Sequence, residues 1–251
     1  MADLDRRASS APYGTAAWGQ AAAADIDVGL RQYMLRVYNY MASGLLLSGI
    51  VAVVVANTSL AGLFFQTTAT GRLGYTGLGF VAMLAPLGII LAMSFMRNLS
   101  ITALSGLYWA LVSTMGVGFA VLLQVYTGTS VARVFFITAA AFGGLSLYGY
   151  TAKRSLSGMA SFMIMGLIGI LIASVVNIFV ASSMMSFIIS VGGVIVFAGL
   201  TAYDTQNIKN QYLDIRGSGL EDRTAIMGAV SLYLNFVNLF QFLLSLLGNR
   251  E

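Results

Sequence analysis

Long runs of apolar residues, separated by short polar breaks, fill the chain from about residue 37 to the C-terminus. Each run is about 20 residues long and lacks the period-2 alternation of a barrel strand, which predicts membrane-spanning helices. Seven spans are expected, at residues 37–56, 73–96, 101–125, 131–150, 159–180, 185–203 and 225–247. The expected fold class is an all-α membrane protein with seven transmembrane helices.

The composition agrees with this pattern. Hydrophobic residues make up 58% of the 251 and charged residues only 9%, with a mean hydropathy of +0.85. A soluble domain has about 25% charged residues, so the lipid bilayer is the expected partner. No nucleic-acid partner is expected despite the net charge of +4, because the basic residues are scattered at helix ends instead of forming a patch.

Residues 1–30 are rich in alanine, weakly charged and without apolar periodicity, which predicts a disordered tail ahead of a transmembrane domain at 31–251. No apolar segment follows Arg6 and Arg7, so no signal peptide is expected. The glycine-rich segment 71–79 has the wrong spacing for a phosphate loop and predicts a plain loop before the second span.

The positions of Lys and Arg predict the orientation. With seven spans, ten basic residues fall on one membrane face: Arg6, Arg7, Arg31, Arg36, Arg97, Lys153, Arg154, Lys209, Arg216 and Arg223. The other face has three, namely Arg72, Arg133 and Arg250. The N-terminus is therefore expected in the cytoplasm and the C-terminus outside.

Asp204 is the single acidic residue between Val28 and Leu213. A carboxylate persists within hydrocarbon only if it faces protein, water or a counter-charge, so Asp204 is the leading candidate for function. Arg97, at the end of the second span, reaches the same face and is either its ion-pair partner or a topology anchor. A sixth helix that continued to Gln211 would let Asp204 meet Asn235, whereas one ending at Tyr203 would leave them about 10 Å apart.

The seventh span carries a polar stripe with helical spacing, at Ser231, Asn235, Asn238, Gln241 and Ser245. In lipid such a stripe must face other helices or water, so this helix is expected in the centre, surrounded by the other six. The stripe either holds the bundle together by interhelical hydrogen bonds or lines a polar path, with Thr201 on the face that carries Asp204.

Enzymatic functions are disfavoured. The chain has no Cys and no His, which removes thiolate and imidazole metal sites and Cys-His or Ser-His catalysis. An intramembrane aspartyl protease needs a second carboxylate on the next helix, and a retinal pigment needs a lysine inside the seventh span. Neither is present. No cofactor is expected beyond a transient calcium ion.

Two segments resemble the paired signature of the Bax inhibitor family: 203–209 (Tyr-Asp-Thr-Gln-Asn-Ile-Lys) and 232–240 (Leu-Tyr-Leu-Asn-Phe-Val-Asn-Leu-Phe). Segments 95–97 (Phe-Met-Arg) and 132–138 (Ala-Arg-Val-Phe-Phe-Ile-Thr) fit its bacterial branch. The resemblance covers residues 32–248 and implies a central seventh helix wrapped by six others.

Several members of the family are described as pH-sensitive calcium leak channels. In them two aspartates, on helices six and seven, share a proton, and an arginine ending helix two latches the path shut. By position Asp204 matches the first aspartate and Arg97 the arginine, while Asn235 replaces the second aspartate.

This replacement removes the repulsion that couples two carboxylates. Any pH response is therefore expected to involve one proton and to lie at more acidic pH than in a relative with two aspartates. One carboxylate and an amide oxygen should hold calcium only weakly.

The leading hypothesis is a calcium leak channel of a bacterial inner membrane. Asp204 and Asn235 form its ion and proton site, Arg97 is the counter-charge, and Ser231, Asn238, Thr201 and Gln241 line the interior. The alternative is a regulatory partner of a membrane-anchored quality-control protease, because some bacterial relatives are described as restraining one. In that case the tail at 1–30 would be a natural handle.

Overall fold

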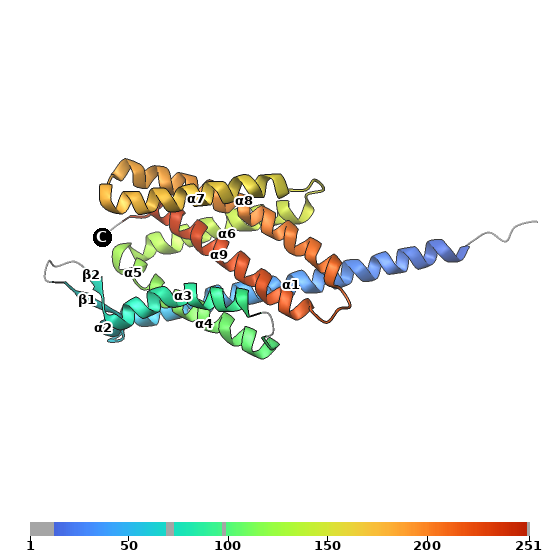
Figure 1. Cartoon of the computed structure of the whole chain (residues 1–251), viewed down its shortest axis with the longest axis horizontal. Helices are drawn as coiled ribbons and strands as arrows, with labels where there is room; N and C mark the ends of the chain where they lie inside the picture. The colour runs from blue at the N-terminus through green and yellow to red at the C-terminus, as the bar shows by residue number, and fades with distance from the viewer. Residues whose placement is uncertain (1–12, 69–72, 97–98, 250–251) are drawn as a thin grey trace, which may run out of the picture.

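The computed structural model describes the backbone of residues 13–68, 73–96 and 99–249, and side chains in these ranges except those of 13–27 and 73. The described chain forms nine helices and one two-stranded hairpin (Figure 1). They are α1 (Tyr13–Asn57), α2 (Ala61–Phe64), β1 (Phe65–Thr67), β2 (Leu73–Tyr75), α3 (Gly77–Phe95), α4 (Ile101–Phe119), α5 (Leu122–Val125), α6 (Gly128–Thr151), α7 (Ser157–Val180), α8 (Ser183–Ile215) and α9 (Glu221–Leu247).

Seven stretches of the described chain are long and apolar enough to cross a membrane, which confirms the predicted fold class. They are α3, α6, α7, α8 and α9, the part of α1 from Val28 to Asn57, and α4 with α5 as Ile101–Val125. The N-terminal extension of α1 and the C-terminal end of α9 lie at opposite ends of the bundle (Figure 1), as an odd number of crossings requires.

Helix α9 is the central element. Half of its most apolar stretch is buried, against 6% for α7. It packs directly on α1, α4, α6 and α8, whereas α3 packs mainly on α4, and α7 on α8. The outward faces carry exposed apolar side chains such as Phe95 and Phe179, as expected of a surface in contact with lipid.

Hydroxyl side chains mark where four spanning helices begin. In each case the oxygen accepts a hydrogen bond of 3.0–3.3 Å from a backbone N–H three residues later. An N-cap of this kind contributes about 1 kcal/mol to a helix. The capping residues are Thr76 for α3, Ser100 for α4, Thr127 for α6 and Ser182 for α8.

The structure differs from the sequence prediction in three places. Helix α8 continues twelve residues beyond the predicted end at Tyr203, to Ile215. The segment 71–79, predicted as a plain loop before the second span, contains strand β2, which pairs with β1, and the first residues of α3. Helix α1 begins at Tyr13, so helix covers residues assigned to the unstructured tail, while residues 1–12 lie outside the described residues.

The closest approach of α6 to α8 is at Gly149, which is buried against the backbone of Ala202. A methyl group added at Gly149 would overlap the Ala202 carbonyl oxygen, and backbone at such a contact cannot yield as a side-chain tip can. This contact holds α6 beside the part of α8 that carries Asp204.

The change Gly149→Val should therefore destabilise the protein by about 1–3 kcal/mol, the usual cost of overpacking. The measurement is the apparent melting temperature of the detergent-solubilised chain. Gly144→Val is the matched control, because an added Cβ at Gly144 meets no atom within 4 Å. Equal melting temperatures for the two variants would contradict the packing argument.

Candidate functional site

Asp204 and Asn235 are brought together at the contact between α8 and α9. The amide Nδ2 of Asn235 donates a hydrogen bond of 2.7 Å to Oδ2 of Asp204. Asn235 is buried with 5% exposure, and Asp204 is partly buried. Asp204 lies eleven residues before the end of α8 at Ile215, a rise of about 16 Å, so the carboxylate is well inside the helix.

The threonines on either side of Asp204 find hydrogen-bond partners inside the protein, so this part of α8 can be buried. The hydroxyl of Thr201 donates to the carbonyl of Phe197 at 2.7 Å, and that of Thr205 lies 2.9 Å from the carbonyl of Thr201. A serine or threonine satisfied by its own helix can remain buried at little cost. The extension of α8 thus places Asp204 beside Asn235 instead of at a helix end.

A chain of hydroxyl groups runs from α1 through α6 to α8, next to Asp204. The hydroxyls of Tyr38 and Ser146 are 2.6 Å apart, and those of Ser146 and Thr205 are 2.9 Å apart. These contacts join three helices through side chains and end one residue from Asp204 in sequence. Tyr38 and Ser146 could not be identified from the sequence, because each is unremarkable on its own helix.

The polar stripe of α9 does not act as one surface. Asn235 bonds to α8, and Ser245 accepts a 3.1 Å hydrogen bond from Ser190, also on α8. Asn238 instead donates to the carbonyl of Leu234 on its own helix. Gln241 is exposed and Ser231 is partly buried. Of the four residues predicted to line the interior, Thr201 alone is buried.

Arg97, the predicted counter-charge of Asp204, lies outside the described residues. Its nearest described neighbours in sequence, Met96 and Leu99, are both bound by Arg223 at the start of α9. The guanidinium of Arg223 donates to the carbonyl of Leu99 at 3.1 Å and to that of Met96 at 3.4 Å. In the sequence, Arg223 contributes only to the prediction of orientation.

The first turn of α9, which contains Arg223, also forms an ion pair with α1. Arg36 on α1 forms an ion pair with Asp222, and both side chains are about half exposed. An exposed pair of this kind contributes less than about 1 kcal/mol. Together with Arg223, it brings α1, α9 and the connection between α3 and α4 to the same end of the bundle.

Gln206 fastens the connection between α6 and α7. Its side-chain oxygen accepts from the backbone N–H of Leu156 at 2.8 Å. Its Nε2 donates to the carbonyls of Arg154 at 2.8 Å and Ala152 at 3.2 Å. Lys209, one turn further along α8, donates to the carbonyl of Tyr150 at 2.7 Å. The segment that resembles a family signature therefore also has a structural role.

The described residues contain no group of three or more His, Cys, Asp or Glu side chains that could hold a metal ion. At the Asp204 site the recorded ligand atoms are one carboxylate and one amide, and the amide presents its NH₂ to the carboxylate. Calcium normally takes six to eight oxygen ligands, so this pair suits a passing cation better than a resident one.

The change Gln206→Leu should loosen the connection between α6 and α7, because it leaves one buried N–H and two carbonyls without their partners. Trypsin cleavage after Lys153 and Arg154 in the purified protein should become faster. Gln211→Leu, on the same helix, is the control and should be cleaved at the wild-type rate. A rate for Gln206→Leu equal to that of the control would contradict the role of Gln206.

Comparison with known proteins identifies the family of this bundle. The family model described as Inhibitor of apoptosis-promoting Bax1 matches residues 30–251. An uncharacterised protein of Caulobacter vibrioides is 45% identical over 230 residues, which cover 90% of this chain and 92% of the relative. Inner membrane protein YbhL of Escherichia coli K12 is 40% identical over 226 residues, 89% and 94% of the two chains. This multi-pass membrane protein belongs to the Bax inhibitor family.

Proposed function

We propose that the protein is a passive cation leak, for calcium, in the inner membrane of a bacterium, with its N-terminus in the cytoplasm. The observation that carries the proposal is the Asp204–Asn235 hydrogen bond between α8 and the central helix α9. An ionisable side chain within a transmembrane bundle commonly marks an ion or proton pathway. The name of the Escherichia coli relative supports the membrane assignment.

In the conformation described, the amide of Asn235 stands where a cation would approach the carboxylate. Its NH₂ group carries partial positive charge and is hydrogen-bonded to Oδ2 of Asp204. Rotation of this amide would turn its oxygen toward the same space and pair it with the carboxylate as a calcium ligand. The pair can therefore alternate between a closed hydrogen bond and a weak cation site without moving the backbone.

Closure at the basic face is proposed to involve Arg97 as a latch. Arg223 holds the carbonyls of Met96 and Leu99, on either side of the undescribed residues 97–98. Helix α3 packs mainly on α4 rather than on α9. Release of the Arg223 contacts would therefore free the end of α3 without disturbing the centre of the bundle.

The change Asp204→Asn should abolish calcium flux through liposomes that contain the purified protein, because the only carboxylate of the pair is lost. Flux is measured with a calcium-sensitive dye trapped inside the vesicles. Asp214→Asn is the matched control, since Asp214 is exposed on the same helix, and it should conduct like the wild type.

Wild-type flux equal to that of protein-free vesicles would exclude the leak-channel proposal. The liposomes contain no protease, so the same result would not argue against the alternative proposal. That alternative is regulation of a membrane-anchored quality-control protease.

The change Asn235→Asp should alter the pH dependence of the flux. Two carboxylates at hydrogen-bond distance repel one another, so one of them keeps its proton to a higher pH, and the two titrate as a coupled pair. The pH profile should become steeper and its midpoint should move toward neutral pH. Flux is measured over a pH series, with Asn238→Asp as the control because Asn238 bonds to its own helix.

An unchanged profile for Asn235→Asp would show that Asp204 and residue 235 do not titrate together, and would contradict the proposed site.

A further inference from the structure

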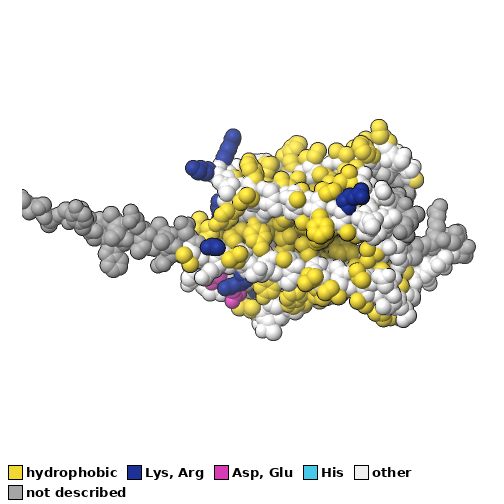
Figure 2. Space-filling model, turned by 180° about the vertical axis from the view of Figure 1, so that it is seen from behind, with side chains coloured by type: hydrophobic (Ala, Val, Ile, Leu, Met, Phe, Trp, Pro, Cys, Tyr) yellow, Lys and Arg dark blue, Asp and Glu magenta, His cyan; other side chains and the backbone are white. Residues whose placement is uncertain are grey.

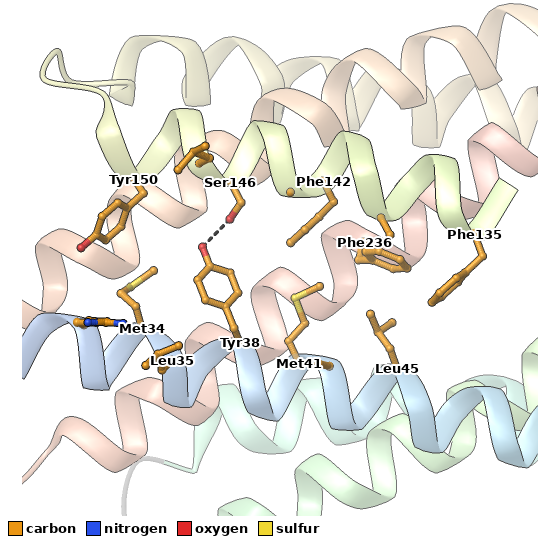
Figure 3. Close-up of a pocket in the computed structure, with 15 residues that line it drawn as sticks. Met34, Leu35, Tyr38, Met41, Leu45, Phe135, Phe142, Ser146, Tyr150 and Phe236 are labelled. Atoms are coloured by element: carbon orange, nitrogen blue, oxygen red, sulfur yellow. Dashed lines mark hydrogen bonds between the residues drawn. The ribbon is translucent and has the colours of Figure 1, made fainter. Parts of the chain in front are cut away.

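A cavity of about 720 Å³ lies between α1 and α6, separate from the Asp204 pair. Both helices pack on α9 but make little direct contact with each other. Phe236 of α9 reaches the cavity between them (Figure 3). Figure 2 shows a hollow lined by hydrophobic side chains along the middle of the face opposite to that of Figure 1. Leu35 and Leu147, which also line the cavity, are 50% and 64% exposed, so it opens toward lipid.

The lining is basic at one end and mostly apolar along the rest. Arg31 and Tyr150 line the end toward the basic face of the bundle, and the Tyr38–Ser146 pair lies further inside (Figure 3). The Nζ of Lys209 lies 5.5 Å from the centre of the Tyr150 ring, which adds a second cation near this end. No acidic side chain is among the described residues that line the cavity. This end therefore favours an anionic group.

The remainder of the lining is built from large apolar side chains, most of which converge in Figure 3 on the space between the two helices. They come from α1, α6 and α9 and include Met34, Met41, Leu45, Phe135, Phe142 and Phe236. The hydroxyls of Tyr38 and Ser146 bond to each other across the cavity at 2.6 Å and so are already satisfied. The deep part of the cavity offers apolar contact and favours a hydrocarbon chain.

The length of the cavity matches one leaflet of a bilayer. From Arg31 to Leu45, the α1 residues that line it at either end, the helix rises about 21 Å. The hydrocarbon core is about 30 Å thick, so one leaflet contributes about 15 Å, with the headgroup beyond it. Further apolar hollows continue from Leu45 toward Val54 along α1, so the basic end at Arg31, and not the length of the groove, favours a lipid over a partner helix.

We propose that the groove between α1 and α6 is a binding site for a phospholipid with an anionic headgroup, taken from the leaflet on the Arg31 side. The headgroup phosphate is bound by Arg31, with Lys209 contributing positive potential, and one acyl chain lies between α1 and α6 on Phe236. Basic pockets between transmembrane helices are known to select anionic lipids. This site is independent of the proposed cation leak.

Native mass spectrometry of the detergent-purified chain, mixed with equal amounts of phosphatidylglycerol and phosphatidylethanolamine, tests the site. The wild type should retain phosphatidylglycerol preferentially. Gly143→Phe should abolish this retention, because Gly143 lines the cavity and an added Cβ meets no atom within 4 Å, so the ring fills the groove without a clash at its base. Gly144→Phe is the matched control, since Gly144 is equally open but does not line the cavity.

The headgroup contact is tested by Arg31→Gln, which should lower retention of phosphatidylglycerol about fivefold, the effect of one basic side chain at a membrane surface. Arg154→Gln is the control, because Arg154 is exposed in the connection between α6 and α7 and does not line the cavity.

Retention unaffected by Gly143→Phe, or equal retention of the two lipids, would overturn the proposal. A dimer that forms in the wild type and is lost in Gly143→Phe would show that a second copy fills the groove instead, which also overturns it.

Discussion

A polar group inside the hydrocarbon of a bilayer has no water to bond with, and this constraint organises the bundle. Many of the polar groups that the sequence places in apolar helices are paired, either with their own helix, as Thr201 is, or across helix contacts. Asn235 bonds to Asp204, and the hydroxyl of Tyr233 lies 2.7 Å from that of Ser48. Both pairs involve α9. Bonds of this kind require α9 to have other helices around it, in agreement with its being the most buried of the spanning helices.

Polar contacts also hold the central helix at both of its ends. At the basic face Arg36 pairs with Asp222, and Arg223 binds the backbone beyond α3. At the opposite face Asn249, just beyond α9, donates its backbone N–H to the hydroxyl of Ser130 at 2.9 Å. With α9 held at both ends, α3 is attached to the centre mainly through α4 and the contacts of Arg223. An opening motion is expected to start there.

The fold could be predicted almost completely from the sequence, because hydropathy alone defines the seven spans, and rarity alone singles out Asp204. The end of α8 could not be predicted, since the run from Asp204 to Gln211 is polar enough to look like a helix end. Its helicity depends on partners on other elements, such as the backbone that Gln206 binds. The roles of Gln206 and Arg223, and the groove between α1 and α6, depend on which distant segments meet. Local patterns do not contain that information.

The central claim is that Asp204 is stabilised within the bundle by Asn235. A double-mutant cycle of Asp204→Leu and Asn235→Leu, read out as the free energy of unfolding in detergent, tests it most directly. A hydrogen bond to a charged group predicts a coupling energy of about 1.5–3 kcal/mol between the two changes. Additivity within about 0.5 kcal/mol would contradict the claim, because residues without direct contact behave in that way.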